Sequence, residues 1–230
     1  MKRYFMILTA VVIFAFMMGC VPRETTTKGD AYPKMYQQKP LAVLVLPPLN
    51  ESTAADAKEY YMVTVAQPIS MYGYYIMPTE VTMPLLRAEG VVDSELLVNA
   101  PLNKFKELMG ADAVLFVKIR KWDTSYYLIG GHMTVSLDLM MKSTVTNDII
   151  WQYDGTFTVD TTVRGGSGWA GLIVQVVGTA IKTAGTDYVP IAARANGMAL
   201  SSLPYGKYHP LFLQDMKTEI VLRGGVSKNQ

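Results

Sequence analysis

The chain has 230 residues, half of them apolar, and carries 21 basic against 19 acidic side chains. This near-neutral balance provides no positive surface for a polyanion, so we expect no nucleic-acid partner. The single cysteine, Cys20, rules out an intramolecular disulfide, and one domain of moderate size must therefore be stabilised by an ordinary apolar core.

The first twenty residues have the pattern of an export signal that ends in a cysteine. Two basic residues provide a positive start, an apolar run extends over 4–18, and Gly19 directly precedes Cys20. The run is short for crossing about 30 Å of hydrocarbon, which favours cleavage over an uncleaved signal anchor. The stretch resembles a bacterial lipoprotein signal. It predicts removal of residues 1–19 and attachment of acyl chains, palmitate among them, to Cys20.

Acylation of Cys20 would hold the mature chain on a membrane, because each buried methylene group contributes about 0.8 kcal/mol. Val21 rather than Asp follows the cysteine, and by resemblance to sorted lipoproteins this favours the outer membrane. The mature chain is neutral, since the two basic residues of the signal are lost with it. We expect the protein to face the periplasm, with exposure at the cell surface as the open alternative.

The mature chain is predicted to have three parts. Residues 20–38 show no periodicity and little to bury, which is typical of a flexible tether. Residues 39–203 carry the periodic patterns of an α/β domain. Residues 204–230 are rich in Pro and Gly and are predicted to form an irregular, partly mobile tail.

A strand–helix–strand unit opens the predicted domain. The aliphatic run Leu41–Leu46 has the length and composition of a strand buried on both faces. Thr53 and Asp56 resemble a capping box for a helix to about Ser70, in which Pro68 predicts a kink or an early end. Gly73 should stop the helix before a second strand over 74–77. Helical segments are then predicted from Thr79 to Gly90 and from Ser94 to Met109.

The middle of the chain predicts an antiparallel meander. Residues 113–119 form an apolar strand, and apolar residues alternate with polar ones over 132–142 and again over 151–159. Gly130-Gly131 and Asn147-Asp148 stand where tight turns are needed. The expected fold is thus α/β, with a mixed sheet covered by helices.

The last third of the domain is predicted to be helical. Residues 168–184 are apolar and uncharged before Lys182, which favours a helix buried against the meander over a membrane-inserting or oligomer-forming helix. A further helix should begin at Asp187 and run to about Ser202, with Pro190 tolerated in its first turn.

Two chemical motifs meet in the same glycine-rich stretch. Gly166–Gly171 fits the G-x-G-x-x-G pattern of nucleotide-binding loops, with Asp187 at a plausible spacing for a ribose contact. Ser167 also lies in an incomplete nucleophile elbow, for which His132 or His209 would have to be the base. Against nucleotide binding, the preceding strand belongs to an antiparallel meander, so glycines of a sharp strand-to-helix turn are the simpler interpretation. Two histidines and an acylated cysteine also predict no metal site.

The chain contains 14 tyrosines, several in adjacent pairs such as Tyr60-Tyr61 and Tyr74-Tyr75. In most pairs one ring should point into the core and the other outward. An exposed cluster would mark a protein-docking surface, because Tyr buries a large ring while its hydroxyl keeps a partner. Tyr and Trp rings exposed along one groove would instead indicate a carbohydrate or peptidoglycan module.

Three motifs in a fixed order resemble those of a family of bacterial lipoproteins of unknown function, first noticed as candidate meningococcal surface antigens. They are the strand 41–46 with the following Pro47–Ser52, the stretch Pro68–Pro78, and Gly110–Leu115 running on to Trp122. The resemblance covers about 39–208. It implies a fold similar to the amino-terminal domain of TolB and to LpoB, and a membrane-tethered interaction module that forms dimers. It brings no catalytic residues.

These observations predict an outer-membrane lipoprotein that acts as an accessory, protein-binding module in envelope assembly or secretion. We expect no enzymatic activity and no cofactor. The resemblance implies envelope proteins as partners, CsgG-like lipoproteins among them, and a homodimer. The alternatives are a nucleotide-binding or enzymatic domain that uses Gly166–Gly171, and a peptidoglycan- or carbohydrate-binding module.

Overall fold

The computed structural model describes residues 25–91, 94–127, 130–160 and 189–221. Predictions for the signal, Cys20, the Gly166–Gly171 loop and the apolar stretch 168–184 therefore lie outside the described residues. Across the parts of the chain that are described, no helix is both long and apolar enough to cross a bilayer.

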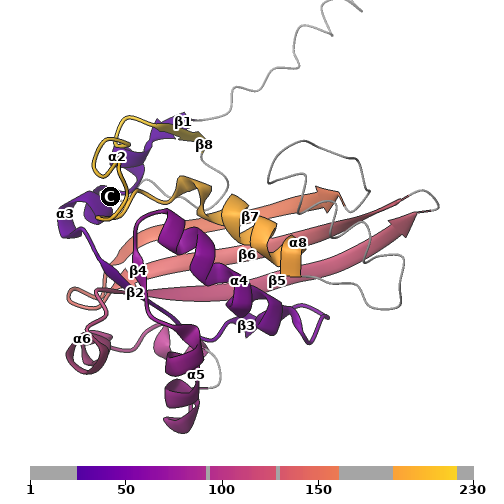
Figure 1. The fold of residues 1–230 in the computed structure, drawn as a ribbon, viewed down its shortest axis with the longest axis horizontal. Helices are drawn as coiled ribbons and strands as arrows, with labels where there is room; N and C mark the ends of the chain where they lie inside the picture. The colour runs from indigo at the N-terminus through magenta and orange to yellow at the C-terminus, as the bar shows by residue number, and fades with distance from the viewer. Residues whose placement is uncertain (1–24, 92–93, 128–129, 161–188, 222–230) are drawn as a thin grey trace, which may run out of the picture.

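A mixed six-stranded sheet forms the centre of the molecule (Figure 1). Its strand order is β4-β2-β5-β6-β7, and β3 pairs with β5 beside that path. The strands β2, β3 and β4 run parallel to their neighbours, whereas β5, β6 and β7 form an antiparallel meander. Their bounds are β2 Ala42–Val45, β3 Leu49–Asn50, β4 Tyr75–Ile76, β5 Ala113–Tyr127, β6 Gly130–Ser143 and β7 Ile149–Asp160. The predicted α/β fold with a mixed sheet is confirmed.

Burial explains why these segments become strands. In β2, Val43, Leu44 and Val45 are all fully buried, because helices cover both faces of the sheet at this point. In β6, the alternate residues Leu137, Leu139 and Met141 are buried. The period of two in the sequence therefore marks a strand with one face in the core.

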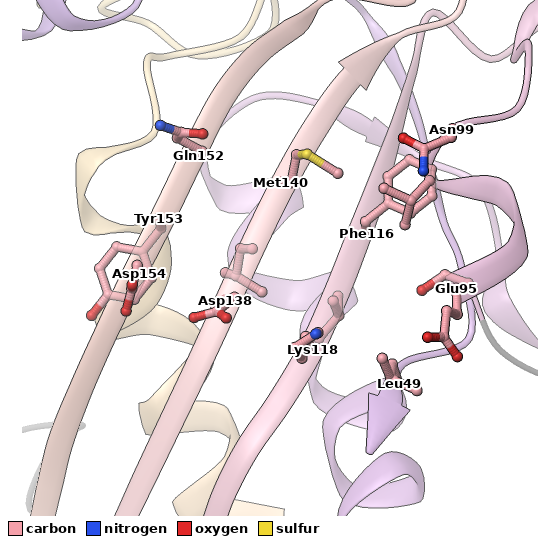
Figure 2. Close-up of a pocket in the computed structure, with 14 residues that line it drawn as sticks. Leu49, Glu95, Asn99, Phe116, Lys118, Asp138, Met140, Gln152, Tyr153 and Asp154 are labelled. Carbon is pink, nitrogen blue, oxygen red and sulfur yellow. The ribbon is translucent and has the colours of Figure 1, made fainter. Parts of the chain in front are cut away.

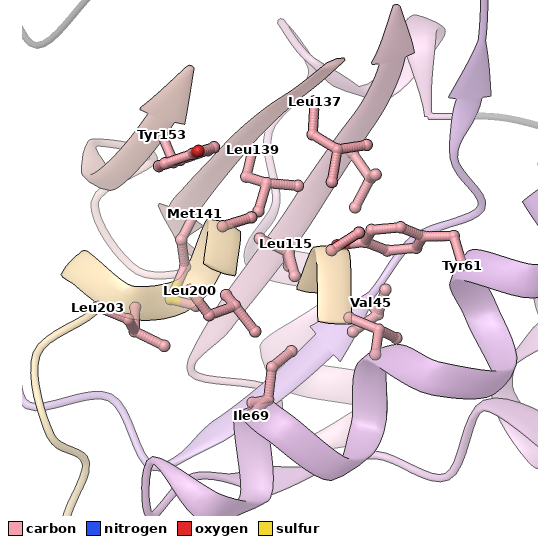
Figure 3. Packing of buried hydrophobic residues seen from close by; sticks show 14 of the residues in the cluster. Val45, Tyr61, Ile69, Leu115, Leu137, Leu139, Met141, Tyr153, Leu200 and Leu203 are labelled. Atoms are coloured by element: carbon pink, nitrogen blue, oxygen red, sulfur yellow. The ribbon is translucent and has the colours of Figure 1, made fainter. Parts of the chain in front are cut away.

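Two helical layers cover the sheet unequally. The helices α4 (Ala57–Met71) and α8 (Val189–Ala199), with the 3₁₀ turn η2 (Leu200–Ser202), pack on one face and build the larger core (Figure 3). On the other face, a smaller core holds α5 (Thr79–Ala88), the 3₁₀ turn η1 (Glu95–Leu97) and α6 (Asn103–Met109) against β2 and the start of β5. Among the described elements, no helix covers the rest of this second face, over β6 and β7.

The helix α4 differs in detail from the prediction. It begins at Ala57, and its N-cap Asp56 makes no side-chain capping bond, so the predicted capping box of Thr53 and Asp56 is wrong. Pro68 lies inside the helix, which continues to Met71. The predicted stop at Gly73 is confirmed by its φ of 84°. A Cβ at this position would lie 2.3 Å from the backbone nitrogen of His209, so only glycine fits.

The ordered domain begins earlier than predicted. Residues that were expected to belong to a flexible tether form β1 (Thr25–Thr27), α2 (Lys28–Ala31) and α3 (Pro33–Gln38). Tyr32, Met35 and Tyr36 are buried, and Tyr32 and Met35 join the larger core. The tether prediction is therefore wrong for residues 25–38. Three large side chains pack against the domain although their spacing in the sequence shows no periodicity.

The predicted irregular tail is also tied to the domain. Residues 205–218 consist mainly of turns, and β8 (Glu219–Val221) pairs antiparallel with β1. The buried Asp215 accepts hydrogen bonds from the Tyr36 hydroxyl at 3.1 Å and from the Tyr205 amide at 3.0 Å. Its carboxylate also pairs with the buried ammonium group of Lys28 at 3.3 Å. Within 205–221, the prediction of a mobile tail is therefore corrected.

Candidate functional site

The part of the sheet that no described helix covers carries an open groove of about 500 Å³. Strands β5, β6 and β7 form its floor, and β3 and the segment around η1 form one wall (Figure 2). The lining residues are Leu49, Ser94, Glu95, Val98, Asn99, Phe116, Val117, Lys118, Asp138, Leu139, Met140, Gln152, Tyr153 and Asp154.

Strand register sets the composition of the groove floor. Lys118, Asp138 and Asp154 are direct neighbours across β5, β6 and β7, and they form a charged row. The next row, Phe116, Met140 and Gln152, is apolar or neutral. Figure 2 shows these side chains standing on adjacent strands, with Glu95 and Asn99 facing them from the wall.

One arginine links the carboxylates of this face. The guanidinium group of Arg120 pairs with Asp138 at 2.9 Å and also with Asp154. Burial and the neighbouring charge of Asp154 raise the pKa of Asp138, and this rise is opposed by Arg120. A second pair joins Lys118 and Glu51 at 2.9 Å. All of these side chains are between a third and a half exposed, so each pair alone contributes little to stability.

The groove region carries a negative excess. Four carboxylates, those of Glu51, Glu95, Asp138 and Asp154, stand against three cations, the partly exposed Lys118 and Arg120 and the buried Lys142 that bonds to the groove wall. Further along the same face, the hydroxyls of Ser136 and Thr156 are hydrogen-bonded at 2.8 Å, and Thr158 is exposed. The surface is thus polar, pre-ordered by ion pairs, and complementary to a basic partner.

The wall of the groove is fixed by a lysine of the sheet. Lys142 in β6 is buried and donates a hydrogen bond from its ammonium group to the Val98 carbonyl at 2.7 Å. Ser94, at the start of the same segment, is buried as well. The η1 segment is therefore held against the sheet and gives the groove a rigid side.

The structure does not assemble the predicted hydrolytic site from described residues. His132 lies in β6, opposite Ser125 and Asp160, whereas His209 lies against Gly73 and stacks on Tyr205 with 3.6 Å between ring centroids. The Nδ1 atom of His209 accepts a hydrogen bond from the Leu211 amide at 3.1 Å. Ser167 and the nucleotide-binding loop lie outside the described residues, so those hypotheses remain predictions. Within the described residues, no group of three or more His, Cys, Asp or Glu side chains is arranged to hold a metal ion.

The prediction that one ring of each tyrosine pair points into the core and the other outward holds for one of the two pairs that can be compared. Tyr74 is buried and Tyr75 is 51% exposed, which confirms the prediction for that pair. Tyr60 and Tyr61 both contribute to the larger core, so the rule is wrong there. Trp122 and Trp151 are buried, and neither ring is available to stack on a sugar.

The charged row of the groove was not identified from the sequence. The polar positions of β6 and β7 were visible, because Asp138 and Asp154 alternate with apolar residues. The sequence did not reveal the register of the strands. This register places Arg120 beside both carboxylates, although Arg120 lies at an irregular step of β5. A bulge of this kind has no reliable signal in a single sequence.

Comparisons with known proteins identify relatives of this chain. A family model described as "Putative lipoprotein GNA1162-like" matches residues 30–207. A curated lipoprotein of Neisseria meningitidis serogroup B is 26% identical over 156 residues, which cover 68% of this chain and 72% of that protein.

Two solved structures are also similar. The lipoprotein GNA1162 of Neisseria meningitidis shares 26% identity with a TM-score of 0.49, over 63% of this chain and 100% of that chain. LpoB of Escherichia coli shares 14% identity with a TM-score of 0.37, over 62% of this chain and 72% of that chain. The match of the family model over most of the chain confirms the resemblance seen in the sequence, and the chain belongs to the GNA1162-like lipoprotein family.

Proposed function

We propose that this protein is an acylated outer-membrane lipoprotein that serves as an accessory module of the cell envelope by docking a basic surface of a protein partner in the sheet groove. Acylation at Cys20 supplies the anchor, and the groove supplies the recognition surface. The membership in a lipoprotein family supports the first part of the proposal.

The observation that carries the second part is the charged face of β5, β6 and β7 that the described helices leave open. On the opposite face, α4 and α8 build the larger core, whereas the described helices leave this face open beside the wall formed by the η1 segment. Ion pairs that are half-exposed and pre-ordered contribute more to partner choice and association rate than to folding. The excess of carboxylates favours lysine- or arginine-rich partners over acidic ones.

Site-specific photo-crosslinking in intact cells tests the proposal. A photo-reactive amino acid at Thr156, which is exposed on the open face, should give a crosslinked product of discrete mass. The matched control position is Val63, which is 67% exposed on α4, on the opposite side of the sheet, and should give none. A product of twice the mass of the chain would identify a second copy as the partner.

The effect of charge substitutions on the yield of the crosslinked product distinguishes specific docking from random contact. In the D138N/D154N background the crosslink at Thr156 should weaken severalfold, because the carboxylates that attract a basic partner are gone. The protein should remain folded, since exposed pairs contribute about 0.2–1 kcal/mol each. Equal crosslinking at Thr156 and Val63, or a product unaffected by the double substitution, would refute the proposed docking site.

A further inference from the structure

The segment from Lys207 to Lys217, here called the 207–217 loop, exposes large apolar side chains to solvent. Tyr208 is 67% exposed, Leu211 is 47% exposed and Met216 is 43% exposed. Leu213 is 36% exposed in the same loop, and the lysines at both ends are exposed. Large exposed apolar side chains concentrated in one short segment are a reason to look for a membrane or protein contact there.

The loop is held firmly, so this exposure is built into the fold. The Gly206 amide donates to the Tyr72 carbonyl at 2.8 Å, and the Tyr208 amide donates to the Gly73 carbonyl at 3.0 Å. A Cβ at Gly206 would lie 2.6 Å from the Gly73 carbonyl oxygen, which shows how closely the two segments approach. At its other end, the loop is fixed by the buried Asp215 through its ion pair with Lys28.

The loop also lies beside the start of the described chain (Figure 1). The Gly29 amide donates to the Met216 carbonyl at 2.9 Å, and the Lys28 amide donates to the Thr218 carbonyl at 2.9 Å. The strand β8, which follows the loop, pairs with β1. The 207–217 loop is thus part of the same end of the molecule as Thr25.

Chain length limits how far this end can move from an anchor at Cys20. Five residue steps separate Cys20 from Thr25, and an extended chain spans at most about 3.3–3.6 Å per residue. Thr25 can therefore lie no more than about 18 Å from the backbone of Cys20. A domain fastened so closely keeps this end near the surface of the bilayer that holds the anchor.

We propose that the 207–217 loop is a second membrane contact, which inserts Tyr208, Leu211, Leu213 and Met216 into the headgroup region of the bilayer that holds the acyl chains. Lys207 and Lys217 flank these residues and match the phosphates of anionic lipids. This inference rests on the proposed acylation of Cys20. Its consequence is a defined orientation, in which the groove is presented at a constant angle to the membrane.

A single introduced thiol tests the contact. Cys20 is the only cysteine of the chain, and in the acylated protein its sulfur is blocked, so the L211C variant carries one free thiol for an environment-sensitive fluorophore. The control is L108C, because Leu108 is 81% exposed on α6, which packs in the smaller core on the other face of the sheet. Both proteins, as purified from the cell envelope, are reconstituted into vesicles of phosphatidylethanolamine and phosphatidylglycerol, with and without nitroxide-labelled lipid.

The expected result is a blue-shifted emission and strong nitroxide quenching at position 211, with neither at position 108. M216C provides a second probe position in case L211C disturbs the loop, and it should be quenched like position 211. A K207E/K217E background should reduce the quenching in these vesicles and leave it unchanged in vesicles of phosphatidylcholine alone.

The other outcomes overturn the inference in distinguishable ways. Protein that floats with the vesicles but shows equal, water-like emission at 211 and 108 retains its anchor and has no second contact. A blue shift without nitroxide quenching means that a second copy or another protein covers the loop. Protein that fails to float with the vesicles lacks the anchor, which refutes the proposed acylation together with the contact.

Discussion

Asp112 shows how one side chain joins two parallel strands. Its Oδ2 atom accepts hydrogen bonds from the amides of Leu41 and Ala42, each at 2.9 Å, and its other oxygen pairs with Lys106. The Asp112 amide in turn donates to the Ala42 carbonyl at 2.8 Å. The residue thus fixes the start of β2 beside the start of β5, and it explains physically why the motif Gly110–Leu115 carries an aspartate.

This geometry predicts that Asp112→Ala lowers the free energy of unfolding by about 1–3 kcal/mol, because two backbone donors lose their acceptor. Asp112→Asn should cost less, since the amide oxygen can still accept both bonds and only the pair with Lys106 is lost. Denaturant unfolding of the three proteins at neutral pH measures the difference. Equal losses in both variants would contradict the assigned role of the backbone bonds.

The same residue predicts a pH dependence. Burial alone would raise the pKa of Asp112, but the bonds from Lys106, Ala42 and Leu41 together lower it below the ordinary value of 3.8. A carboxyl with a lowered folded-state pKa stabilises the protein above the unfolded-state pKa and loses that contribution as the pH falls through the folded-state value. The stability advantage of the natural chain over Asp112→Asn should therefore be constant near neutrality and shrink below about pH 4. Unfolding curves between pH 3 and pH 7 provide the test.

At the scale of the element, α8 shows how small residues allow close packing. Ala192, Ala195 and Ala199 are fully buried, and this face of the helix packs against α4 and the meander. Asn196 is also buried and donates to the Thr64 hydroxyl of α4 at 2.9 Å. This face of the helix thus combines close approach with a specific polar contact that fixes the pairing of the two helices.

The exposed side of the same helix contains a glycine that lowers its stability. Gly197 lies inside α8, is exposed, and has open space where a Cβ would be. Gly197→Ala should raise the free energy of unfolding by about 0.5–1 kcal/mol, because alanine reduces the backbone freedom lost on folding. Ala193→Gly, at a half-buried position of the helix, should lower it by a similar amount. Thermal or chemical unfolding of both variants tests the pair, and a loss of stability in Gly197→Ala would contradict the open geometry.

At the scale of the whole molecule, the N-terminal and C-terminal segments depend on each other. The ammonium group of Lys28 lies 2.8 Å from the Leu203 carbonyl and 3.3 Å from Asp215, and it stands over the Tyr205 ring. Burial lowers the pKa of Lys28, and the nearby carboxylate of Asp215 opposes this effect. A charge in such a site is tolerated only while its partner remains.

A chain shortened to begin at Lys39 should consequently be much less stable than one that begins at Thr25. The chain that begins at Lys39 would lose the stabilisation from the burial of Tyr32, Met35 and Tyr36. Its Asp215 would also be a buried charge without Lys28. Removal of one partner of a buried pair alone costs about 3–5 kcal/mol. Side-by-side unfolding of the two shortened proteins tests the boundary. Equal stability would mean that residues 25–38 act only as a tether, as the sequence suggested.

Local patterns in the sequence predicted much of the fold. The alternation in β6 and β7, the aliphatic run of β2 and the positive-φ glycines Gly73 and Gly110 each reflect a requirement that acts over a few neighbouring residues. Such requirements leave a periodic or positional signal, which explains why the strand–helix–strand unit and the meander were predicted correctly. The fold class and the family were therefore accessible from the order of the amino acids.

The candidate site and the ends of the domain were decided by tertiary structure alone. Lys28 and Asp215 are separated by 187 positions, and each lies in a segment whose composition is typical of solvated chain. The contact of Arg120 with Asp138 and Asp154 depends on strand register and on an irregular step in β5. By itself the sequence determined which residues alternate between core and surface, because that depends on local backbone geometry. Only the folded chain decided which distant charges meet, because charged side chains look the same in a sequence whether water or a partner surrounds them.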